Sequence, residues 1–313
     1  MITLTTGTKL RRLYENDKDK FKQWFSTLSK KEQAEVVTSW AFQARDKQLR
    51  PEGKWNTLLW LCGRGFGKTR ALCEDLIANA MSNPGKRIAI VGRTAADVRD
   101  IIINGESGIL ACCTARDIRV NYEPSKRLIT FPNGSIAQTY TAEQPDQLRG
   151  VQFHDAYCDE LAAWQYDTMT WDMLLMTMRL GNDNKIMIAT TPQPTQLIRK
   201  LTNTEGVHVV RGSTFDNAAN LSETYVEVLK REYEGTRIGR QELYGEVLLD
   251  TPGALWNWDM IHKAEELPQF KRIVVGVDPA ASNNKDSDET GIVVAAYGDY
   301  SVDRMISYLI YEE

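Results

Sequence analysis

The segment LLWLCGRGFGKTRAL, at residues 58–72, most restricts what this chain can fold into. An apolar run leads into a glycine-rich turn, then into Lys68 and Thr69, and then into residues that favour a helix. This order is typical of a loop whose backbone N–H groups and helix N-terminus surround phosphate. The usual pattern, G-x-x-x-x-G-K-[ST], begins with glycine, whereas this chain has Cys62 there. We therefore predict a phosphate-binding loop with a variant entrance; the alternative is a glycine-rich turn without a ligand.

The residue types within this loop suit a nucleotide. The lysine would neutralise charge on the β- and γ-phosphates, and the Thr69 hydroxyl would help to hold Mg²⁺. Arg64 adds a planar fork of donors, which would either stabilise the γ-phosphate in the transition state or pair with a nearby carboxylate. The residues that we expect to bind the nucleotide here are Gly63, Arg64, Gly65, Phe66, Gly67, Lys68, Thr69 and Arg70.

Composition places the chain among globular proteins of one large or two medium domains, with 313 residues, 42% of them hydrophobic and 26% charged. No apolar run approaches the ~20 residues that span a bilayer, and the N-terminus has no apolar signal core. We therefore expect a cytoplasmic protein. Its five cysteines form no C-x-x-C pair, which favours reduced thiols over disulfides or a zinc site.

The net charge of −4 gives no overall surplus of basic residues for nucleic acid. DNA contacts would have to come from local clusters, such as Lys9 with Arg11 and Arg12, or Arg237 with Arg240. A solvated surface explains these clusters equally well.

Short apolar runs alternate with helical stretches along the next part of the chain. This alternation predicts an α/β fold with a mainly parallel sheet flanked by helices. Ligands of such sheets lie at the carboxyl ends of the strands, where the loop, Asp159-Glu160 and Thr190-Thr191-Pro192 all fall. The expected elements are one or two helices in 17–45, strands at 57–62, 87–92, 155–160, 185–192 and 207–214, a hairpin at 127–140, and helices at 69–81, 95–105, 164–180 and 222–235.

Two acidic residues end the strand at 155–160. Asp159 could hold Mg²⁺ through water, and Glu160 could orient or deprotonate an attacking water. An Asp-Glu pair alone is a weak signal, but its position at a strand end, with another strand following, strengthens it. Asp155 is a competitor for the metal role, although it lies too early in the strand.

The segments CGRGFGKTR, YCDELAAW, IATTPQP and GVDPA, in this order, resemble the large terminase subunit of tailed double-stranded DNA bacteriophages. That protein is the motor that packages the viral genome. The resemblance extends from about Arg45 to Thr290 and implies a P-loop NTPase fold with ATP and Mg²⁺ as cofactors. An arginine after the first glycine of the loop is common in that family. The resemblance therefore implies that Cys62, in place of the usual glycine, is a tolerated departure from the pattern.

The resemblance also implies roles for individual residues. Asp159 would hold the metal, Glu160 would be the catalytic carboxylate, and Thr190-Thr191-Pro192 would be the coupling motif that senses the γ-phosphate. Gln48 resembles the glutamine that reads the adenine edge, for which an amide both donates and accepts.

The same resemblance implies roles for two further arginines. Arg149 resembles an arginine supplied to the neighbouring subunit's site in the motor ring, and Arg93 is a phosphate-sensor candidate. If Arg64 acts within its own subunit, Arg149 would instead form an internal ion pair. The catalytic set implied is thus Glu160, Arg64 and Arg149.

Near residue 252 the sequence becomes irregular and aromatic, and three strands follow at 272–280, 289–298 and 304–313. The expected organisation is a helical cap at 1–45, a P-loop ATPase domain at 46–251, a linker at 252–270, and the first strands of an RNase H-like nuclease at 271–313.

A nuclease of that kind uses two metal ions, Mg²⁺ or Mn²⁺, held by several carboxylates. Asp278 fits the first ligand, whereas Asp286 and Asp288 lie in a polar loop where solvation explains them better. No later acidic residues complete the pattern, so the nuclease domain is expected to be incomplete, which argues against endonuclease activity of this chain.

The implied partners are viral double-stranded DNA, the portal protein, the small terminase subunit and further copies of the chain in a ring, with no membrane. The implied location is the cytoplasm of the infected bacterial host, outside the mature virion. Two other functions stay open. A helicase-like DNA-dependent ATPase would need a second motor-like domain, which the residues after Pro252 are too few to supply. A truncated remnant would bind nucleotide without turnover.

Overall fold

The structure is a computed structural model that describes residues 4–248, 269–278, 291–299 and 305–310. Its contacts group the chain into two units, Met1–Leu249 and Asp250–Glu313. The first unit contains the N-terminal helices and an eight-stranded sheet, and the second contains a three-stranded sheet.

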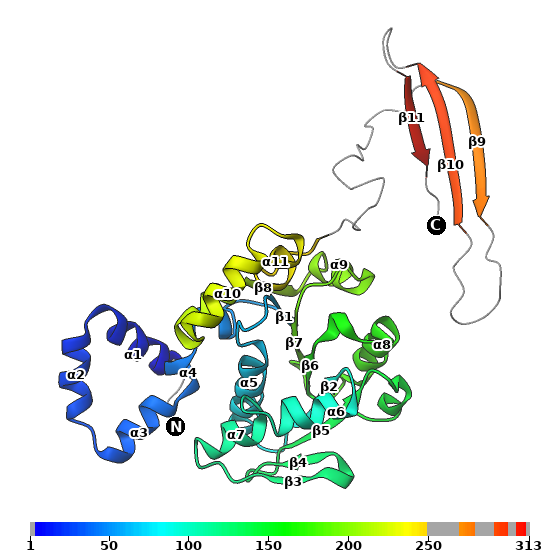
Figure 1. The fold of residues 1–313 in the computed structure, drawn as a ribbon. Coiled ribbons are helices and arrows are strands. Elements are labelled where there is room, and N and C mark those ends of the chain that lie inside the picture. Colours follow the sequence, from blue (N-terminus) through cyan, green and yellow to red (C-terminus); the bar gives the residue numbers. More distant parts are fainter. Residues whose placement is uncertain (1–3, 249–268, 279–290, 300–304, 311–313) are drawn as a thin grey trace. The chain divides into compact units, whose positions relative to one another are not determined.

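The first unit begins with a group of short helices, drawn in blue in Figure 1. These helices are α1 (Leu4–Asn16), α2 (Lys18–Ser26), α3 (Lys30–Thr38) and α4 (Trp40–Gln43). Asp17, Ser29 and Ser39 each start a new helix, because each side chain accepts a hydrogen bond from a backbone N–H in the next turn. The ring of Phe21 packs against those of Tyr14 and Phe42, with centroid distances of 5.2 and 5.5 Å.

This region holds more helix than the sequence predicted. Three helices, α2 to α4, lie where one or two were expected, and α1 precedes them. Gly7 weakens the helix signal of α1 because glycine is a poor helix former. The structure shows why position 7 needs glycine: a Cβ at Gly7 would lie 2.4 Å from Cβ of Ala41 in α4.

The sheet of the first unit is mainly parallel, as predicted. Its strands are β1 (Thr57–Cys62), β2 (Arg87–Gly92), β3 (Asn121–Glu123), β4 (Leu128–Thr130), β5 (Ile136–Thr141), β6 (Asp155–Asp159), β7 (Lys185–Thr190) and β8 (Val207–Gly212). Their order is β3-β4-β5-β2-β6-β7-β1-β8, and only the β3-β4-β5 edge is antiparallel. The hairpin expected at 127–140 is present as β4 and β5, whereas the short edge strand β3 was not predicted.

Helices cover both faces of this sheet (Figure 1). In β1, where every residue is buried, Leu58 and Trp60 join the core on the side of α5 (Lys68–Ser82), and Leu59 and Leu61 join the core on the side of α8 (Asp167–Thr177). Alternate residues of a strand point to opposite faces, so a continuous apolar run fits a strand that is covered twice. The layered architecture predicted from the alternation is therefore confirmed.

The remaining helices of the first unit are short. They are α6 (Ala95–Asp97), the π-helix η2 (Val98–Ile103), α7 (Ile109–Thr114), α9 (Gln196–Thr202), α10 (Glu223–Tyr233) and α11 (Arg237–Glu242), with 3₁₀ segments η1 (Asp46–Gln48), η3 (Pro124–Lys126), η4 (Pro145–Leu148), η5 (Leu161–Ala163) and η6 (Thr214–Asn220). The helix expected at 95–105 is present as α6 and η2. The sequence did not single out α7, α9 and α11, because they have too few turns for a clear apolar period.

The second unit is an antiparallel sheet formed by β9 (Phe270–Asp278), β10 (Gly291–Asp299) and β11 (Met305–Ile310), in the order β11-β10-β9. These strands match the three that the sequence predicted. Asp278 is the last residue of β9 and pairs with Gly291, but its side chain lies outside the described part of the chain. The expected linker up to residue 268, Asp286 and Asp288 also lie outside it.

No helix among the described residues is long and apolar enough to cross a membrane.

Candidate active site

The three motifs expected at strand ends meet at one edge of the first sheet. The strands β6, β7 and β1 are neighbours in that order and run parallel. Their carboxyl ends therefore lie side by side, so Asp159 at the end of β6, Thr190 at the end of β7 and the loop after β1 converge. Nothing in the order of these motifs along the chain would show that β7 lies between the other two.

The glycines of the loop serve two different purposes. Gly65 and Gly67 have φ angles of 72° and 88°, which glycine adopts without the steric cost that a Cβ brings. Gly63 is needed for space, because a Cβ there would lie 2.4 Å from the carbonyl oxygen of Leu243. Helix α5 then begins at Lys68, directly after the loop.

Position 62, where the usual loop pattern has glycine, does not require glycine in this fold. It is still part of β1, where it pairs with Gly212, and its side chain is fully buried in the core. Burial raises the pKa of the Cys62 thiol to about 12, so the group stays neutral. The variant entrance of the loop is thus an ordinary strand residue.

Lys68 lies inside the loop and is only 7% exposed. Its Nζ donates hydrogen bonds to the carbonyl oxygens of Cys62 and Gly63, at 2.9 and 3.0 Å, and to Oγ1 of Thr191 at 3.0 Å. Burial lowers the pKa of Lys68, while the nearby Glu160 acts in the opposite direction. The loop and the end of β7 are thus joined by an ammonium group that a phosphate would attract.

Asp159 is buried beside the start of α5. It is 6% exposed, and Oγ1 of Thr69 donates a long hydrogen bond of 3.4 Å to its Oδ1. Burial raises the pKa of Asp159 to about 7, and the charge of Glu160 adds to this shift. The nearby Lys68 therefore compensates the charge of this carboxylate only in part.

These two residues fit a magnesium ion. A hydroxyl and a carboxylate are oxygen ligands of the kind that Mg²⁺ prefers, and Mg²⁺ is usually held by one or two carboxylates together with phosphates. No group of three or more His, Cys, Asp or Glu side chains in the described ranges could hold a metal by itself. The donor set of Thr69 and Asp159 thus suits a metal that is shared with a nucleotide.

Glu160 has an unusual backbone conformation. Its φ of 49° lies in the left-handed region, which costs a non-glycine residue about 1–3 kcal/mol and is common at functional sites. The conformation turns the carboxylate to the end of β7, where Oε2 accepts from the Thr191 N–H at 3.3 Å and Oε1 from its hydroxyl at 3.4 Å. Thr191 therefore lies between Lys68 and Glu160 and contacts both.

The arginines proposed from the sequence all have carboxylate partners. Arg64 Nε lies 2.5 Å from Oε2 of Glu242, at the end of α11, although its side chain is 72% exposed. Hydrogen bonding to Glu242 raises the pKa of Arg64. Arg70 points along α5 to the fully buried Glu74, at 2.9 Å.

Arg93 and Arg149 lie on the surface. Arg93 pairs with Asp97 at 2.8 Å. Arg149 pairs with Asp146 at 2.6 Å, and both side chains of this pair are more than half exposed. The sequence left an internal ion pair of Arg149 open as an alternative, and the structure contains one. Because exposed ion pairs are weak, Arg149 could leave Asp146 for another partner.

Gln48 lies against the loop and is 5% exposed. Its Nε2 donates to the carbonyl oxygen of Gly67 at 3.1 Å, and its Oε1 accepts from the Arg45 N–H at 3.1 Å. An amide has a second N–H and a second lone pair, so one donor and one acceptor site remain for a base.

Asp155, the competitor for the metal role, has a structural function. It is 1% exposed, and its carboxylate accepts from Lys86 Nζ at 2.5 Å, from Asn79 Nδ2 at 2.8 Å and from the Lys185 N–H at 3.0 Å. Its charge is therefore compensated at the amino end of β6, away from the edge where the motifs meet.

Sequence reasoning missed several side chains that hold the loop from outside. Arg45 donates to the carbonyl oxygen of Phe66, and Asn217 Nδ2 donates to that of Gly65 at 2.6 Å. These residues come from the segments before β1 and after β8, where the sequence singled out only Gln48 for nucleotide binding. Only the fold brings them to the loop.

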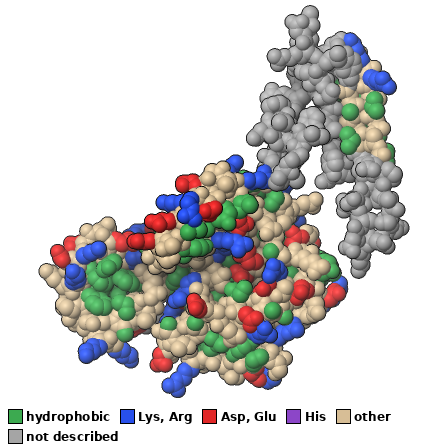
Figure 2. Space-filling view, in the orientation of Figure 1, with side chains coloured by type: hydrophobic (Ala, Val, Ile, Leu, Met, Phe, Trp, Pro, Cys, Tyr) green, Lys and Arg blue, Asp and Glu red, His purple; other side chains and the backbone are tan. Residues whose placement is uncertain are grey.

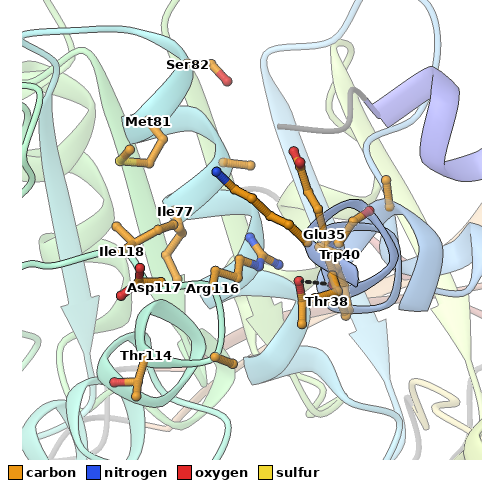
Figure 3. A pocket seen from close by; sticks show the side chains of 16 residues that line it. Glu35, Thr38, Trp40, Ile77, Met81, Ser82, Thr114, Arg116, Asp117 and Ile118 are labelled. Carbon is orange, nitrogen blue, oxygen red and sulfur yellow. Dashed lines mark hydrogen bonds between the residues drawn. The ribbon is translucent and has the colours of Figure 1, made fainter. Parts of the chain in front are cut away.

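One pocket of about 790 Å³ lies elsewhere in the first unit. Figure 3 shows Glu35 and Trp40 of the N-terminal helices on one side and Ile77, Met81 and Arg116 on the other. Ile77 and Met81 belong to the end of α5 that is remote from the loop, so this pocket is not part of the candidate site.

The fold is similar to those of known large terminases. The large terminase of a thermophilic bacteriophage gives a TM-score of 0.53 at 14% identity, covering 88% of this chain and 68% of its own length. A structure of that same terminase in complex with ADP gives 0.51 at 15% identity, covering 88% of this chain and 67% of its own length. The ATPase domain of the Thermus phage P74-26 large terminase gives 0.51 at 16% identity, covering 70% of this chain and 98% of that domain.

At these identities the solved structures show the fold alone. No curated protein matches the chain. The family of terminase large subunits of the T4likevirus type, N-terminal part, matches residues 59–263, which include the loop, the Asp-Glu pair and the end of β7. Because this match covers more than half of the sequence, the chain belongs to the family of large terminase subunits of tailed phages.

Proposed function

We propose that the first unit hydrolyses ATP and that this turnover moves viral double-stranded DNA into a procapsid. One observation carries the proposal: Thr191 joins Lys68 of the phosphate-binding loop to Glu160 by hydrogen bonds. Lys68 would bind phosphate, Thr191 would sense the γ-phosphate and Glu160 would act as the base, and one chain of hydrogen bonds would link all three. Membership of the terminase family and the ADP complex of the thermophilic phage terminase support ATP as the ligand.

Binding would rest on the loop and on the start of α5. The N–H groups from Gly65 to Thr69 would surround the phosphates, since those of Gly63 and Arg64 already donate to the carbonyl oxygens of Gly212 and Glu242. Lys68 would exchange its carbonyl partners for phosphate oxygens. Thr69 and Asp159 would hold Mg²⁺, which supplies positive charge next to the phosphates when bound. Gln48 would read the adenine with its remaining donor and acceptor.

Hydrolysis would be an in-line attack of water on the γ-phosphate, with Glu160 orienting the water and taking its proton. Thr191 already bonds the Glu160 carboxylate through both its N–H and its hydroxyl. Loss of the γ-phosphate would change the partners of Lys68, and Thr191 would transmit that change to β7. Thr190 and Pro192 complete this coupling segment, since Thr190 Oγ1 accepts from the Ala162 N–H at 3.0 Å.

The arginines would act on the charge of the transition state. Arg64 would leave Glu242 for the γ-phosphate, and Arg149 would enter the site of a neighbouring copy in a ring. Arg149 now pairs with the exposed Asp146, and exposed pairs of this kind are worth about 0–1 kcal/mol, so Arg149 can exchange its partner at little cost. Arg64 is itself exposed, although its partner Glu242 is partly buried. Arg93 would sense phosphate in the same way, and Arg70 would support the start of α5 through Glu74.

The second unit would be the start of an RNase H-like nuclease that cuts concatemeric DNA. The proposal rests on family membership and on the position of Asp278 at the end of β9. Asp278 would supply one ligand to a pair of Mg²⁺ or Mn²⁺ ions. Further carboxylates would have to join it, because two cations need several. The proposed domains are a helical cap at 1–45, the ATPase at 46–251, a linker at 252–270 and the nuclease strands at 271–313.

The proposed partners are double-stranded DNA, the portal protein, the small terminase subunit and other copies of the chain, in the cytoplasm of the infected host. Figure 2 shows basic and acidic side chains interspersed over the visible face of the first unit. Arg11, in the first basic cluster, is 7% exposed and pairs with Asp46, so it does not offer its charge to DNA. Contacts would come from more exposed groups and should weaken steeply with salt.

Steady-state ATP hydrolysis, with and without linear duplex DNA, tests the proposal. We expect turnover that rises with DNA, and DNA binding that falls as salt increases. Strand separation during turnover would favour the helicase-like alternative. ATP binding without any turnover would favour a nucleotide-binding remnant and contradict the proposal.

A further inference from the structure

Side chains from outside the phosphate-binding loop cap its carbonyl groups one after another. Each carbonyl from Arg64 to Gly67 accepts a hydrogen bond from a side chain of another segment. The bonds are Thr214 Oγ1 to Arg64 O at 2.6 Å, Asn217 Nδ2 to Gly65 O at 2.6 Å, Arg45 to Phe66 O, and Gln48 Nε2 to Gly67 O at 3.1 Å.

The donors come from two segments that lie on either side of the loop in the sequence. One is the stretch that ends in η1, before β1, and the other is η6, after β8. Asn217 joins the two, because its Oδ1 accepts from Arg45 while its Nδ2 donates to the loop. A second link is the ion pair of Lys47 with Asp216, at 2.8 Å.

This arrangement controls the backbone of the loop. A peptide group is planar, so a carbonyl held in one direction also fixes the direction of the N–H in the same plane. Gly65 has no Cβ to oppose rotation of its peptide groups, and its φ is 72°. The peptide that follows Gly65 carries the N–H of Phe66, which donates only a long bond of 3.4 Å to the carbonyl oxygen of Gly63. Without a partner for the Gly65 carbonyl, this peptide could therefore turn and present oxygen where phosphate needs N–H donors.

We propose that Asn217 is a positioning residue for the nucleotide, which holds the loop in its phosphate-receiving conformation through Gly65 and Arg45. The inference rests on the proposed function, since it needs a nucleotide in the loop. Asn217 raises affinity by reducing the ordering cost of binding. It acts on bound substrate and transition state alike, so its loss changes KM rather than kcat.

The test uses the full chain with Asn217→Ala and Asn217→Asp, and measures ATP affinity, KM, kcat and the thermal midpoint. Asn217→Asp keeps an oxygen for Arg45 but places an acceptor opposite the carbonyl of Gly65. We expect both variants to raise the ATP Kd and KM roughly three- to tenfold, the size of one hydrogen bond. The kcat of both variants and their thermal midpoints stay close to those of the unchanged chain.

Asn220→Ala is the matched control. Asn220 donates to Asn217 Oδ1 at 2.9 Å from an exposed position on η6, and no described contact joins it to the loop. It should bind ATP like the unchanged chain. Equal ATP affinity in Asn217→Asp and the unchanged chain would overturn the inference, as would equal weakening by Asn220→Ala. If the unchanged chain does not bind ATP, the proposed function fails together with the inference. If it binds ATP but the Asn217 variants bind equally well, only the inference fails.

Discussion

Nζ of Lys68 donates a 3.0 Å hydrogen bond to Oγ1 of Thr191, and the same hydroxyl donates to Glu160 at 3.4 Å. One hydroxyl thus connects the cation of the loop to the carboxylate proposed as the base. The two ends of this connection follow β1 and β6, which the folded sheet places on either side of β7.

Replacing Thr191 by valine keeps the shape of the side chain but removes this hydroxyl. We expect kcat for ATP hydrolysis to fall about tenfold or more, because the Glu160 carboxylate loses one of the bonds that orient it. Steady-state kinetics measures the change. Thr204→Val is the control, since the Thr204 hydroxyl bonds Lys200 O of its own helix region; an equal loss in both variants would contradict the role of Thr191.

Asp159→Asn should make the metal-free protein more stable at neutral pH. The folded-state pKa of Asp159 is about 7, above the ~3.9 of an unfolded aspartate. Between these values the folded state binds more protons, so this group lowers the unfolding free energy as pH rises from ~4 to ~7. Asparagine carries no charge at any of these pH values, so the variant does not lose unfolding free energy in this way.

The measurement is thermal unfolding in the presence of a chelator at several pH values. We expect Asp159→Asn to exceed the unchanged chain in midpoint at pH ~8 and to approach it near pH ~4, where the carboxyl is protonated in the folded state. A variant that is less stable at high pH would show that the charge of Asp159 is compensated after all.

Asp75→Ala tests a buried network behind the site. Arg50 donates two bonds to the Asp75 carboxylate, at 2.6 and 2.7 Å, and Tyr157 of β6 donates to it at 2.9 Å. Removing the carboxylate leaves the partly buried guanidinium with the Tyr157 hydroxyl, at 3.2 Å, but without its ion-pair partner. The free energy of unfolding should therefore fall by about 3 kcal/mol, the lower end for breaking a buried pair. Urea unfolding measures this. The exposed pair of Arg231 with Glu232 provides the comparison, because Glu232→Ala should cost less than about 1 kcal/mol.

Glu242→Gln and Arg64→Ala should have different effects if Arg64 leaves its partner to act on phosphate. Arg64→Ala should lower kcat on the order of a thousandfold, as expected for a charge-stabilising arginine. Glu242→Gln keeps the size of the side chain and releases the exposed Arg64 from its ion pair, so ATP turnover should be kept and KM should change only a few-fold. Equal loss of kcat in both variants would instead assign the pair a purely structural role.

The local parts of the site could be predicted from the sequence because each depends on a short segment. The loop from Gly63 to Thr69 carries its own glycines, and the structure places α5 directly after it. The alternation of apolar and helical stretches likewise predicted the parallel sheet and its covered faces. Both predictions use only patterns within short segments of the chain.

The remaining parts depend on packing between distant segments. The position of β7 between β1 and β6 is a property of the whole sheet, so the contact of Lys68 with Thr191 could not be derived from spacing. Asn217 lies far along the chain from the loop that it caps, and no pattern marks it. The helix α1 was missed because Gly7 weakens the helix propensity of its sequence. Close packing of α1 against α4, which the sequence does not show, stabilises the helix instead.

ATP turnover by Glu160→Gln, measured beside ATP binding by the same variant, shows whether Glu160 is the catalytic base. Glutamine keeps the size of the side chain but cannot accept a proton from water. We expect ATP binding to stay close to that of the unchanged chain while turnover falls about 10²- to 10⁴-fold, the usual contribution of a general base. Turnover equal to that of the unchanged chain would contradict the assignment of Glu160 and, with it, the proposed mechanism.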